Sequence, residues 1–170
     1  MKKVAQLLNA MLENNIVNNY ALFGAMAQMR YTEAVATMDA DFLVALPEEG
    51  HRLDVLAPIY SFCLAKGYQP AGDAIQVGSW PVQFIPVFDK LLTDALYSAE
   101  SGQIDGVPIR VVRADFLAAV ALSVGRAKDH TRILALLESE CVTMADIASL
   151  AAQYDLEDRW DIFRRRFIDE

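Results

Sequence analysis

The sequence predicts a mixed α/β fold of the α+β kind, in which a mixed sheet flanked by helices is followed by a helical C-terminal part. Strand-like and helix-like segments alternate up to about Arg113, and the pattern is entirely helical from Asp115 onward. Of the 170 residues, 54% are hydrophobic, which is enough for a continuous core. No linker-like stretch separates the parts, so we expect residues 1–113 to form a core on which residues 114–170 pack.

The first elements are predicted from apolar spacing and from the residues that interrupt it. Apolar residues recur at helical spacing over residues 4–12, and the asparagine-rich stretch 14–19 ends that helix. Residues 20–23 form a short apolar strand that stops at Gly24. The small residues that follow favour a helix over residues 25–29. The order is a strand, a glycine turn and a helix.

The next strand is predicted over residues 37–46, where polar and apolar residues alternate and then become continuously apolar. Its two faces differ, with Met38, Ala40 and Phe42 on one and Thr37, Asp39 and Asp41 on the other. After a turn at residues 47–50, a helix through Leu53, Leu56, Ile59, Tyr60 and Leu64 is expected. One strand therefore presents an acidic face.

The remaining elements complete the sheet and the helical part. Residues 74–77 and 80–87 predict a hairpin with its turn at Gly78. Asp89 is a good N-cap for a helix through Leu96, and a final strand spans residues 107–112. Four further helices are expected over residues 115–124, 127–138, 144–153 and 156–167.

Composition limits the classes of function. The formal net charge of −8 argues against a general nucleic-acid-binding surface, although it leaves room for small anions and for a tRNA acceptor. No apolar run reaches the roughly 20 residues that cross a bilayer, and the N-terminus lacks the apolar centre of a signal peptide, so we expect a cytoplasmic protein. Neither Cys63 and Cys141 nor His51 and His130 show zinc-site spacing, and we expect both thiols to be buried and reduced.

Asp39 and Asp41 are the candidate chemical groups. Carboxylates two residues apart on a strand point the same way, roughly 6 to 7 Å apart. Like charges this close disfavour each other's ionisation, and a hard cation such as Mg²⁺ compensates them. Spacing alone also fits a solvated pair on an edge strand. The preceding glycine turn favours the first reading, because a helix N-terminus offers N–H donors to phosphate.

Two sets of motifs carry a resemblance to a known superfamily. The segment Tyr20-Ala-Leu-Phe-Gly-Ala-Met-Ala, followed by Thr37-x-Asp39-x-Asp41-Phe-Leu-Val, resembles the nucleotidyltransferase superfamily. It is most similar to small bacterial proteins related to the toxin subunit of abortive-infection type IV toxin–antitoxin pairs. Gly106-Val-Pro-Ile-Arg-Val-Val and Gly125-Arg126-Ala-Lys128-Asp129 agree with that resemblance.

The resemblance implies a nucleotidyltransferase-like core over residues 1–113 and a set of roles for individual residues. Asp39 and Asp41 would hold Mg²⁺ or Mn²⁺ and carry catalysis. The resemblance also implies the residues that would contact the nucleoside triphosphate, which are Gly24, Ala25, Thr37, Gln83, Arg126 and Lys128. A solvated charged turn at a helix start remains an alternative for Arg126, Lys128 and Asp129.

The chain departs from the superfamily pattern at three places. The turn has Ala25 where a second glycine or a serine is usual. Gln83 stands where a third carboxylate is expected, and an amide cannot act as a base. Asp89 could replace it if the strand were shifted, although an N-cap role is preferred. Val120 and Ala121 occupy the place where related proteins often have a lysine.

Three functions remain open from the sequence. The first is metal-dependent transfer of a nucleotidyl group to an unknown acceptor. In this case the chain could act as the toxin of a toxin–antitoxin pair. The second, favoured by Gln83, is a degenerate relative that binds nucleotide or a protein without turnover. The third is an interaction subunit whose C-terminal helices pack on an antitoxin or on a second copy of the chain.

Overall fold

The computed structural model of the chain describes residues 1–47 and 54–169. These residues divide into two compact units. The first unit comprises Met1–Ala27 and Val35–Val112, and the second comprises Gln28–Ala34 and Arg113–Glu170. The chain enters the second unit twice, at Gln28 and at Arg113. The segment Gln28–Ala34 had no sequence signal for belonging with the helices.

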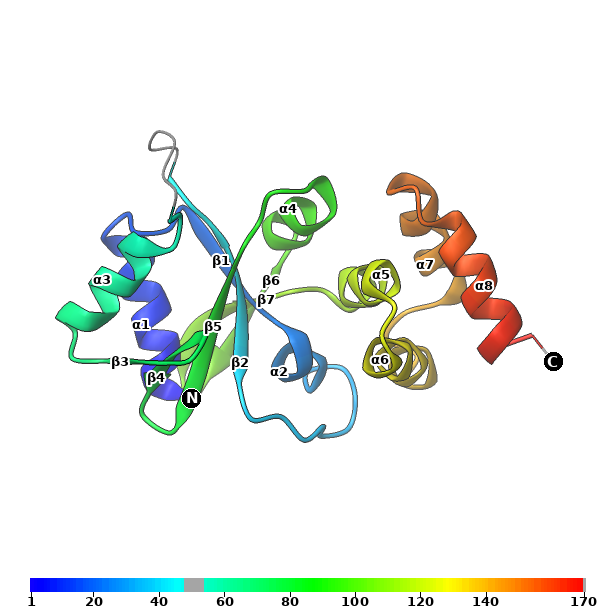
Figure 1. The fold of residues 1–170 in the computed structure, drawn as a ribbon. Helices are drawn as coiled ribbons and strands as arrows, with labels where there is room; N and C mark the ends of the chain where they lie inside the picture. Colours follow the sequence, from blue (N-terminus) through cyan, green and yellow to red (C-terminus); the bar gives the residue numbers. More distant parts are fainter. Residues whose placement is uncertain (48–53, 170) are drawn as a thin grey trace. The chain divides into compact units, whose positions relative to one another are not determined.

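A mixed sheet forms the centre of the first unit (Figure 1). Its elements, in chain order, are α1 (Lys2–Glu13), β1 (Asn19–Phe23), α2 (Gly24–Gln28), β2 (Ala40–Ala45), α3 (Ala57–Ala65), β3 (Gln69–Ala71), β4 (Ala74–Val77), β5 (Trp80–Pro86), α4 (Lys90–Tyr97), β6 (Glu100–Ile104) and β7 (Val107–Val111). The seven strands lie in the order β3-β4-β5-β2-β1-β7-β6. β2 is antiparallel to β1 and parallel to β5, so the predicted mixed sheet is confirmed.

Helices cover both faces of this sheet. Figure 1 shows α1 and α3 on one face and α4 on the other; α1 contacts β1 and β7, while α4 contacts β1 and β2. Beneath α1, the rings of Tyr20 and Phe42 meet edge to face with centroids 6.2 Å apart. The Tyr20 hydroxyl donates to Asn9 Oδ1, and burial raises the Tyr20 pKa to about 12 despite the opposing charge of Arg110. This face is closed by packed side chains.

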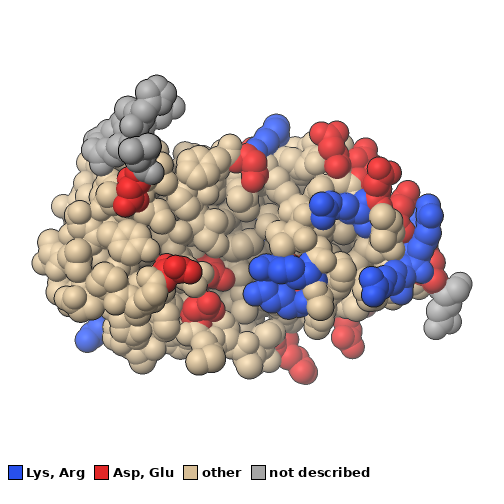
Figure 2. All heavy atoms as spheres, viewed as in Figure 1, with Lys and Arg blue, Asp and Glu red and all other residues tan. Residues whose placement is uncertain are grey.

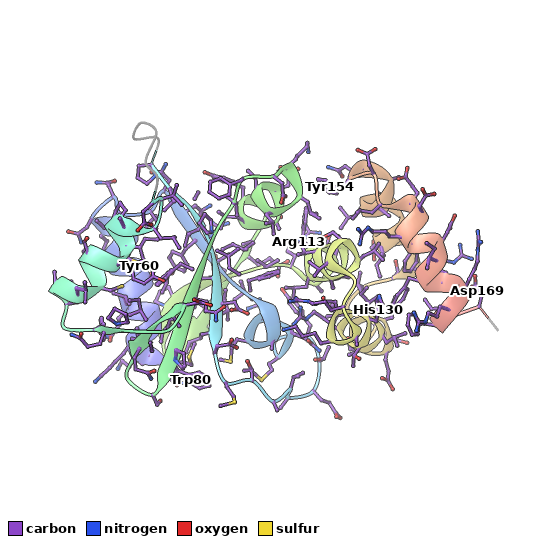
Figure 3. All side chains as sticks on the ribbon, viewed as in Figure 1. Tyr60, Trp80, Arg113, His130, Tyr154 and Asp169 are labelled. Carbon is purple, nitrogen blue, oxygen red and sulfur yellow. The ribbon has the colours of Figure 1, made fainter. Side chains whose placement is uncertain are left out.

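Four helices form most of the second unit, and their boundaries follow the prediction closely: α5 (Ala114–Val124), α6 (Ala127–Glu138), α7 (Met144–Gln153) and α8 (Glu157–Phe167). α5 is apolar along most of its length and contacts the other three helices. The ring of His130 lies 5.6 Å from that of Phe163, between α6 and α8 (Figure 3). Thr143 caps α7 by accepting from Asp146 N, while the Asp146 carboxylate accepts from Thr143 N.

Two strands were not predicted. β3 and β6 are the edges of the sheet, and both are made mainly of exposed polar, proline or glycine residues. Such sequences lack the alternation by which strands are found, and their pairing with β4 and β7 creates them. The turn at Asp105 and Gly106, both with positive φ, is the one local signal for the β6–β7 hairpin.

Two predictions about individual segments were wrong. β2 begins at Ala40, three residues later than predicted, and Met38 is 88% exposed and does not share the buried face of Ala40 and Phe42. Cys141 is exposed, because it lies in the turn after α6, where Glu140 has a φ of 57°, whereas Cys63 is buried in α3 as expected. Both thiols are free.

Some expectations fall on residues 48–53, which lie outside the described residues. They concern Glu48, Glu49, His51, the end of the predicted turn and the start of the helix at Leu53. In the described part, α3 begins at Ala57, with a proline in its first turn. No helix in residues 1–47 or 54–169 is long and apolar enough to span a membrane.

Candidate functional site

The candidate site lies where β1 ends and β2 begins. Asp41, the second residue of β2, is paired in register with Phe23 of β1 on one side and with Gln83 of β5 on the other. Directly paired residues of neighbouring strands project from the same face of a sheet, and the strands lie about 4.8 Å apart. The side chains of Asp41 and Gln83 are therefore neighbours on one face.

Gly24 and Asp41 are in close contact at this edge. Gly24 directly follows β1, begins α2 and has a φ of +66°, a conformation that favours glycine. A Cβ placed on Gly24 would overlap Oδ2 of Asp41. The Asp41 carboxylate thus lies directly against the turn that leads to Ala25, as the strand, glycine turn and helix order indicated. Gly24 could not be exchanged for a residue with a Cβ without moving the Asp41 carboxylate.

Asp39 is positioned by a short local interaction rather than by the sheet. It precedes β2, and like Asp41 it is half-buried. The Thr37 hydroxyl donates toward Asp39, lying 3.0 Å from Oδ1 and 3.2 Å from the main-chain oxygen. Thr37 therefore holds the Asp39 carboxylate in place. The nucleotide contact of Thr37 implied by the sequence resemblance stays a prediction.

The donor set at this edge fits a magnesium ion that keeps part of its own coordination shell. Asp39 and Asp41 offer carboxylate oxygens and Gln83 offers an amide oxygen, which are the hard ligands Mg²⁺ takes. Across residues 1–47 and 54–169, no three His, Cys, Asp or Glu side chains gather as a metal-binding cluster. Such a pair suits an ion whose other ligands are water and substrate phosphate.

Asp89 does not supply a third carboxylate at this edge. It precedes α4, and its Oδ1 accepts a hydrogen bond from Leu92 N at 2.7 Å, so the predicted N-cap role is confirmed. The alternative required a shifted strand, but the register places Gln83 itself opposite Asp41. Asp89 comes after Pro86, the last residue of β5, whereas Gln83 lies within that strand.

Arg126 and Lys128 belong to the second unit, at the start of α6, and both are exposed. Asp129, by contrast, is only 1% exposed, so the reading of all three as a solvated turn is wrong for this carboxylate. Its Oδ2 accepts from Arg126 N at 3.1 Å and from Arg126 Nε at 2.7 Å. Arg132 Nη1 approaches its other oxygen at 3.6 Å.

This ion cluster extends to Gln28, the last residue of α2. Arg132 Nε donates to Gln28 Oε1 at 3.0 Å, and Gln28 is buried. Burial favours the neutral form of Asp129, but the hydrogen bonds from Arg126 and the charges of Arg126 and Arg132 outweigh it and lower the Asp129 pKa. Only the spacing of Asp129 and Arg132 on one helix face hinted at this cluster, since Gln28 lies far away in sequence.

Basic side chains otherwise gather on the C-terminal helices. On the face drawn in Figure 2, Lys and Arg are most numerous toward the helical end of the chain. Arg164, Arg165 and Arg166 occupy the last turn of α8, where positive charge complements the helix dipole, and Arg164 pairs with Asp169 at 3.1 Å. Arg164 therefore has a structural partner in the second unit.

Comparison with known proteins identifies the fold. No family model and no curated protein matches this sequence. The solution structure of the antibiotic-resistance factor ANT(2″)-Ia, an aminoglycoside nucleotidyltransferase, matches with a TM-score of 0.51 and 15% identity over 98% of this chain and 91% of that chain. The crystal structure of ANT(2″)-Ia in complex with adenylyl-2″-tobramycin matches with a TM-score of 0.50 and 15% identity over 96% of each chain.

A nucleotidyltransferase-like protein from Paracoccidioides brasiliensis, described as antigenic, matches with a TM-score of 0.49 and 12% identity over 94% of this chain and 93% of that chain. At such identities the two ANT(2″)-Ia structures establish the architecture alone. This chain has a nucleotidyltransferase-like fold, a mixed sheet with helices that include a C-terminal helical part.

Proposed function

We propose that this chain binds a nucleoside triphosphate together with Mg²⁺ or Mn²⁺ at Asp39 and Asp41 and transfers its nucleotidyl group to an acceptor. The observation that carries this proposal is the contact between Asp41 and Gly24, which joins a carboxylate to a glycine turn at the start of α2. A carboxylate is needed for the cation and a turn with exposed N–H groups for the phosphates. The chain has a nucleotidyltransferase-like fold, and the sequence resemblance to that superfamily led us to expect a carboxylate pair beside a glycine turn.

Each residue at the edge of the sheet has a part in this proposal. Asp39 and Asp41 supply the negative charge, and Thr37 orients Asp39 through its hydroxyl. Gly24 would let the backbone approach the triphosphate closely, and Ala25 would offer its N–H without a bulky side chain. The cation, when bound, neutralises charge that develops on the phosphate oxygens. Catalysis then rests on positioning and electrostatics.

Arg126 and Lys128 are proposed to meet a phosphate or the acceptor. Support comes from their exposure and from the way Asp129 anchors the Arg126 backbone while leaving most of that side chain, 59%, exposed. Nε and Nη2 of this guanidinium donate to Asp129, and a cation that is fixed in this way and still exposed is suited to charge-assisted contact with phosphate.

Thermal unfolding tests the binding step. Magnesium with one of the four ribonucleoside triphosphates should raise the melting temperature, and Asp39→Asn or Asp41→Asn should abolish the increase. Asp73→Asn, an exposed carboxylate in the β3–β4 turn, is the control and should retain it. No increase with any nucleotide, with or without magnesium, would contradict the proposal and favour an interaction subunit.

A second candidate, nucleotide binding without turnover, is favoured by one observation. Gln83 pairs with Asp41 at the position where the sequence resemblance implies a third carboxylate. Pyrophosphate release separates the two functions, because a melting-temperature increase without pyrophosphate from any acceptor indicates binding alone. Release that depends on Asp39 indicates the enzyme.

A toxin role and a protein partner are further parts of the proposal, supported by the sequence resemblance. Induced expression of the chain in bacteria should then arrest growth, and Asp39→Asn should relieve the arrest. Co-expression with the product of a neighbouring small gene should also relieve it if that product is an antitoxin. Growth unaffected by the wild-type chain at a level visible on a gel would argue against toxicity. Gel filtration tests self-association.

A further inference from the structure

The side chain beside Asp41 constrains the acceptor. Gln83 is paired with Asp41 across β2 and β5, and a neutral amide holds no proton-accepting charge at any pH of interest. We propose that the acceptor is a phosphate monoester, whose attacking oxygen is already ionised, rather than a hydroxyl compound whose proton must be removed. This inference rests on the proposed nucleotidyl transfer and names its substrate class.

Neither strand neighbour of Asp41 is a base, and two other polar groups of the first unit are engaged elsewhere. On the β1 side its paired neighbour is Phe23, which carries no proton acceptor. The Thr37 hydroxyl is bonded to Asp39, and the Asp89 carboxylate caps α4. Asp39 and Asp41 themselves serve the cation. Within the described residues of this unit, the one polar side chain paired beside Asp41 is therefore Gln83.

Transfer of the nucleotidyl group to a phosphate monoester needs no general base. The second pKa of such a phosphate is about 6, so it is mainly a dianion at pH 7.5. One of its oxygens attacks the α-phosphorus of the triphosphate, and a new P–O–P bond forms. The bond from the α-phosphorus to the bridging oxygen breaks, and pyrophosphate leaves with that electron pair. No proton leaves the nucleophile.

Transfer to an alcohol differs in one respect. The attacking hydroxyl must lose its proton in the same step, and a positioned general base contributes about 10² to 10⁴ in rate. An amide at residue 83 withholds that contribution from alcohols and leaves phosphate nucleophiles unaffected. Gln83 is thus a specificity-determining residue, and a carboxylate at the same position should widen the range of acceptors.

A panel of matched acceptors tests the inference on the full chain. Each pair has the same carbon skeleton with and without its phosphate, such as glycerol 3-phosphate with glycerol and glucose 6-phosphate with glucose. An RNA oligonucleotide with and without a 5′-phosphate distinguishes a polymer source of the same chemistry from a small molecule. Phosphorus NMR reports the product, since a pyrophosphate diester and a phosphodiester differ in shift. Melting temperature with a non-cleavable α,β-methylene triphosphate reports acceptor binding apart from turnover.

The expected result has three parts. At least one phosphorylated acceptor yields a P–O–P product at 10² times or more the rate of its unphosphorylated partner, and it alone raises the melting temperature of the analogue complex. The rate rises through about pH 6 as the acceptor ionises and is then flat to pH 9. Gln83→Asp gains transfer to hydroxyl compounds, whereas Gln103→Asp, the same change on exposed β6, does not.

The contrary outcomes are separable. Transfer by the wild-type chain to hydroxyl compounds at comparable rates overturns the acceptor class and leaves the proposed function standing. Nucleotide binding without reaction of either half of any pair also overturns it, in favour of binding alone. If no triphosphate raises the melting temperature, both the proposed function and this inference are contradicted.

Discussion

Oδ2 of Asp41 occupies the space that a side chain at residue 24 would need. Gly24→Ala should therefore displace the Asp41 carboxylate, in addition to the strain of a positive φ, about 1 to 2 kcal/mol for a residue with a Cβ. We expect a lower melting temperature and loss of the increase caused by magnesium and nucleotide. Calorimetry with and without nucleotide measures both effects.

Gly72→Ala is the matched control for that substitution. Gly72 has a φ of +63°, close to that of Gly24, but an added Cβ there would meet no atom within 4 Å. The two variants should lose similar stability from backbone strain, and only Gly24→Ala should lose the response to nucleotide. An equal response in both variants would show that the position of Asp41 does not matter for binding.

Thr37 offers a subtler change at the same site. Thr37→Val removes the hydroxyl that donates to Asp39 Oδ1 while keeping the shape of the side chain. A hydrogen bond to a half-buried carboxylate contributes about 1 kcal/mol, so nucleotide affinity in the presence of magnesium should fall about fivefold. Thr37→Ser should retain the affinity. Isothermal titration measures both, and equal affinity of the Val and Ser variants would contradict a positioning role.

Asp129 is the side chain whose loss should most affect the second unit. Asp129→Asn keeps the volume but removes the charge that Arg126 and Arg132 surround in a buried position, at a cost of about 3 kcal/mol in unfolding free energy. Urea unfolding measures this. Asp146→Asn, an exposed capping carboxylate, is the control and should cost less.

The same carboxylate gives the protein a defined response to acid. The pKa of Asp129 is lowered in the folded state, so its contribution is complete above the unfolded value near 3.9 and is lost as pH falls toward the folded pKa. The stability difference between wild type and Asp129→Asn should be constant above about pH 5 and shrink below about pH 4. A difference that grew on acidification would have the wrong sign for a lowered pKa.

The two thiols should differ in reactivity. Cys141 is exposed, whereas Cys63 is buried and its pKa is raised by burial to about 11, so little thiolate forms there at pH 8. A disulfide reagent should modify one thiol rapidly and the second only on unfolding. Cys141→Ser should abolish the rapid phase, and a rapid phase that survived it would contradict the burial of Cys63.

The sequence predicted those parts of the fold that depend on local patterns. The α6 and α7 boundaries, the Asp89 cap and the strand before Gly24 follow from helical periodicity, capping chemistry and glycine conformation. The edge strands β3 and β6 could not be predicted, because their pairing with neighbours, rather than their composition, makes them strands. The late start of β2 was not predicted either, because the alternating sequence pattern continues through Met38, which is exposed and precedes the strand.

At the candidate site, the sequence indicated the side chains but not their neighbours. Asp39 and Asp41 stand out by spacing, and the resemblance pointed to Gln83, yet the pairing of Gln83 with Asp41 required the register of two strands. Contacts between distant residues are equally inaccessible to local patterns. Gln28 and Arg132, 104 positions apart, meet only because the chain folds them together.

The assignment of Gln28–Ala34 to the second unit limits how the chain can be dissected. A protein shortened at Val112 would retain this segment without Arg132 and Cys141, which bond to Gln28 and to Tyr31 O. The helices of residues Arg113–Glu170, expressed alone, would lack the buried Gln28 that accepts from Arg132. Genetic exchange between relatives would meet the same obstacle, because a single crossover at residue 113 cannot transfer either unit whole. The two units therefore have to be exchanged, or engineered, together.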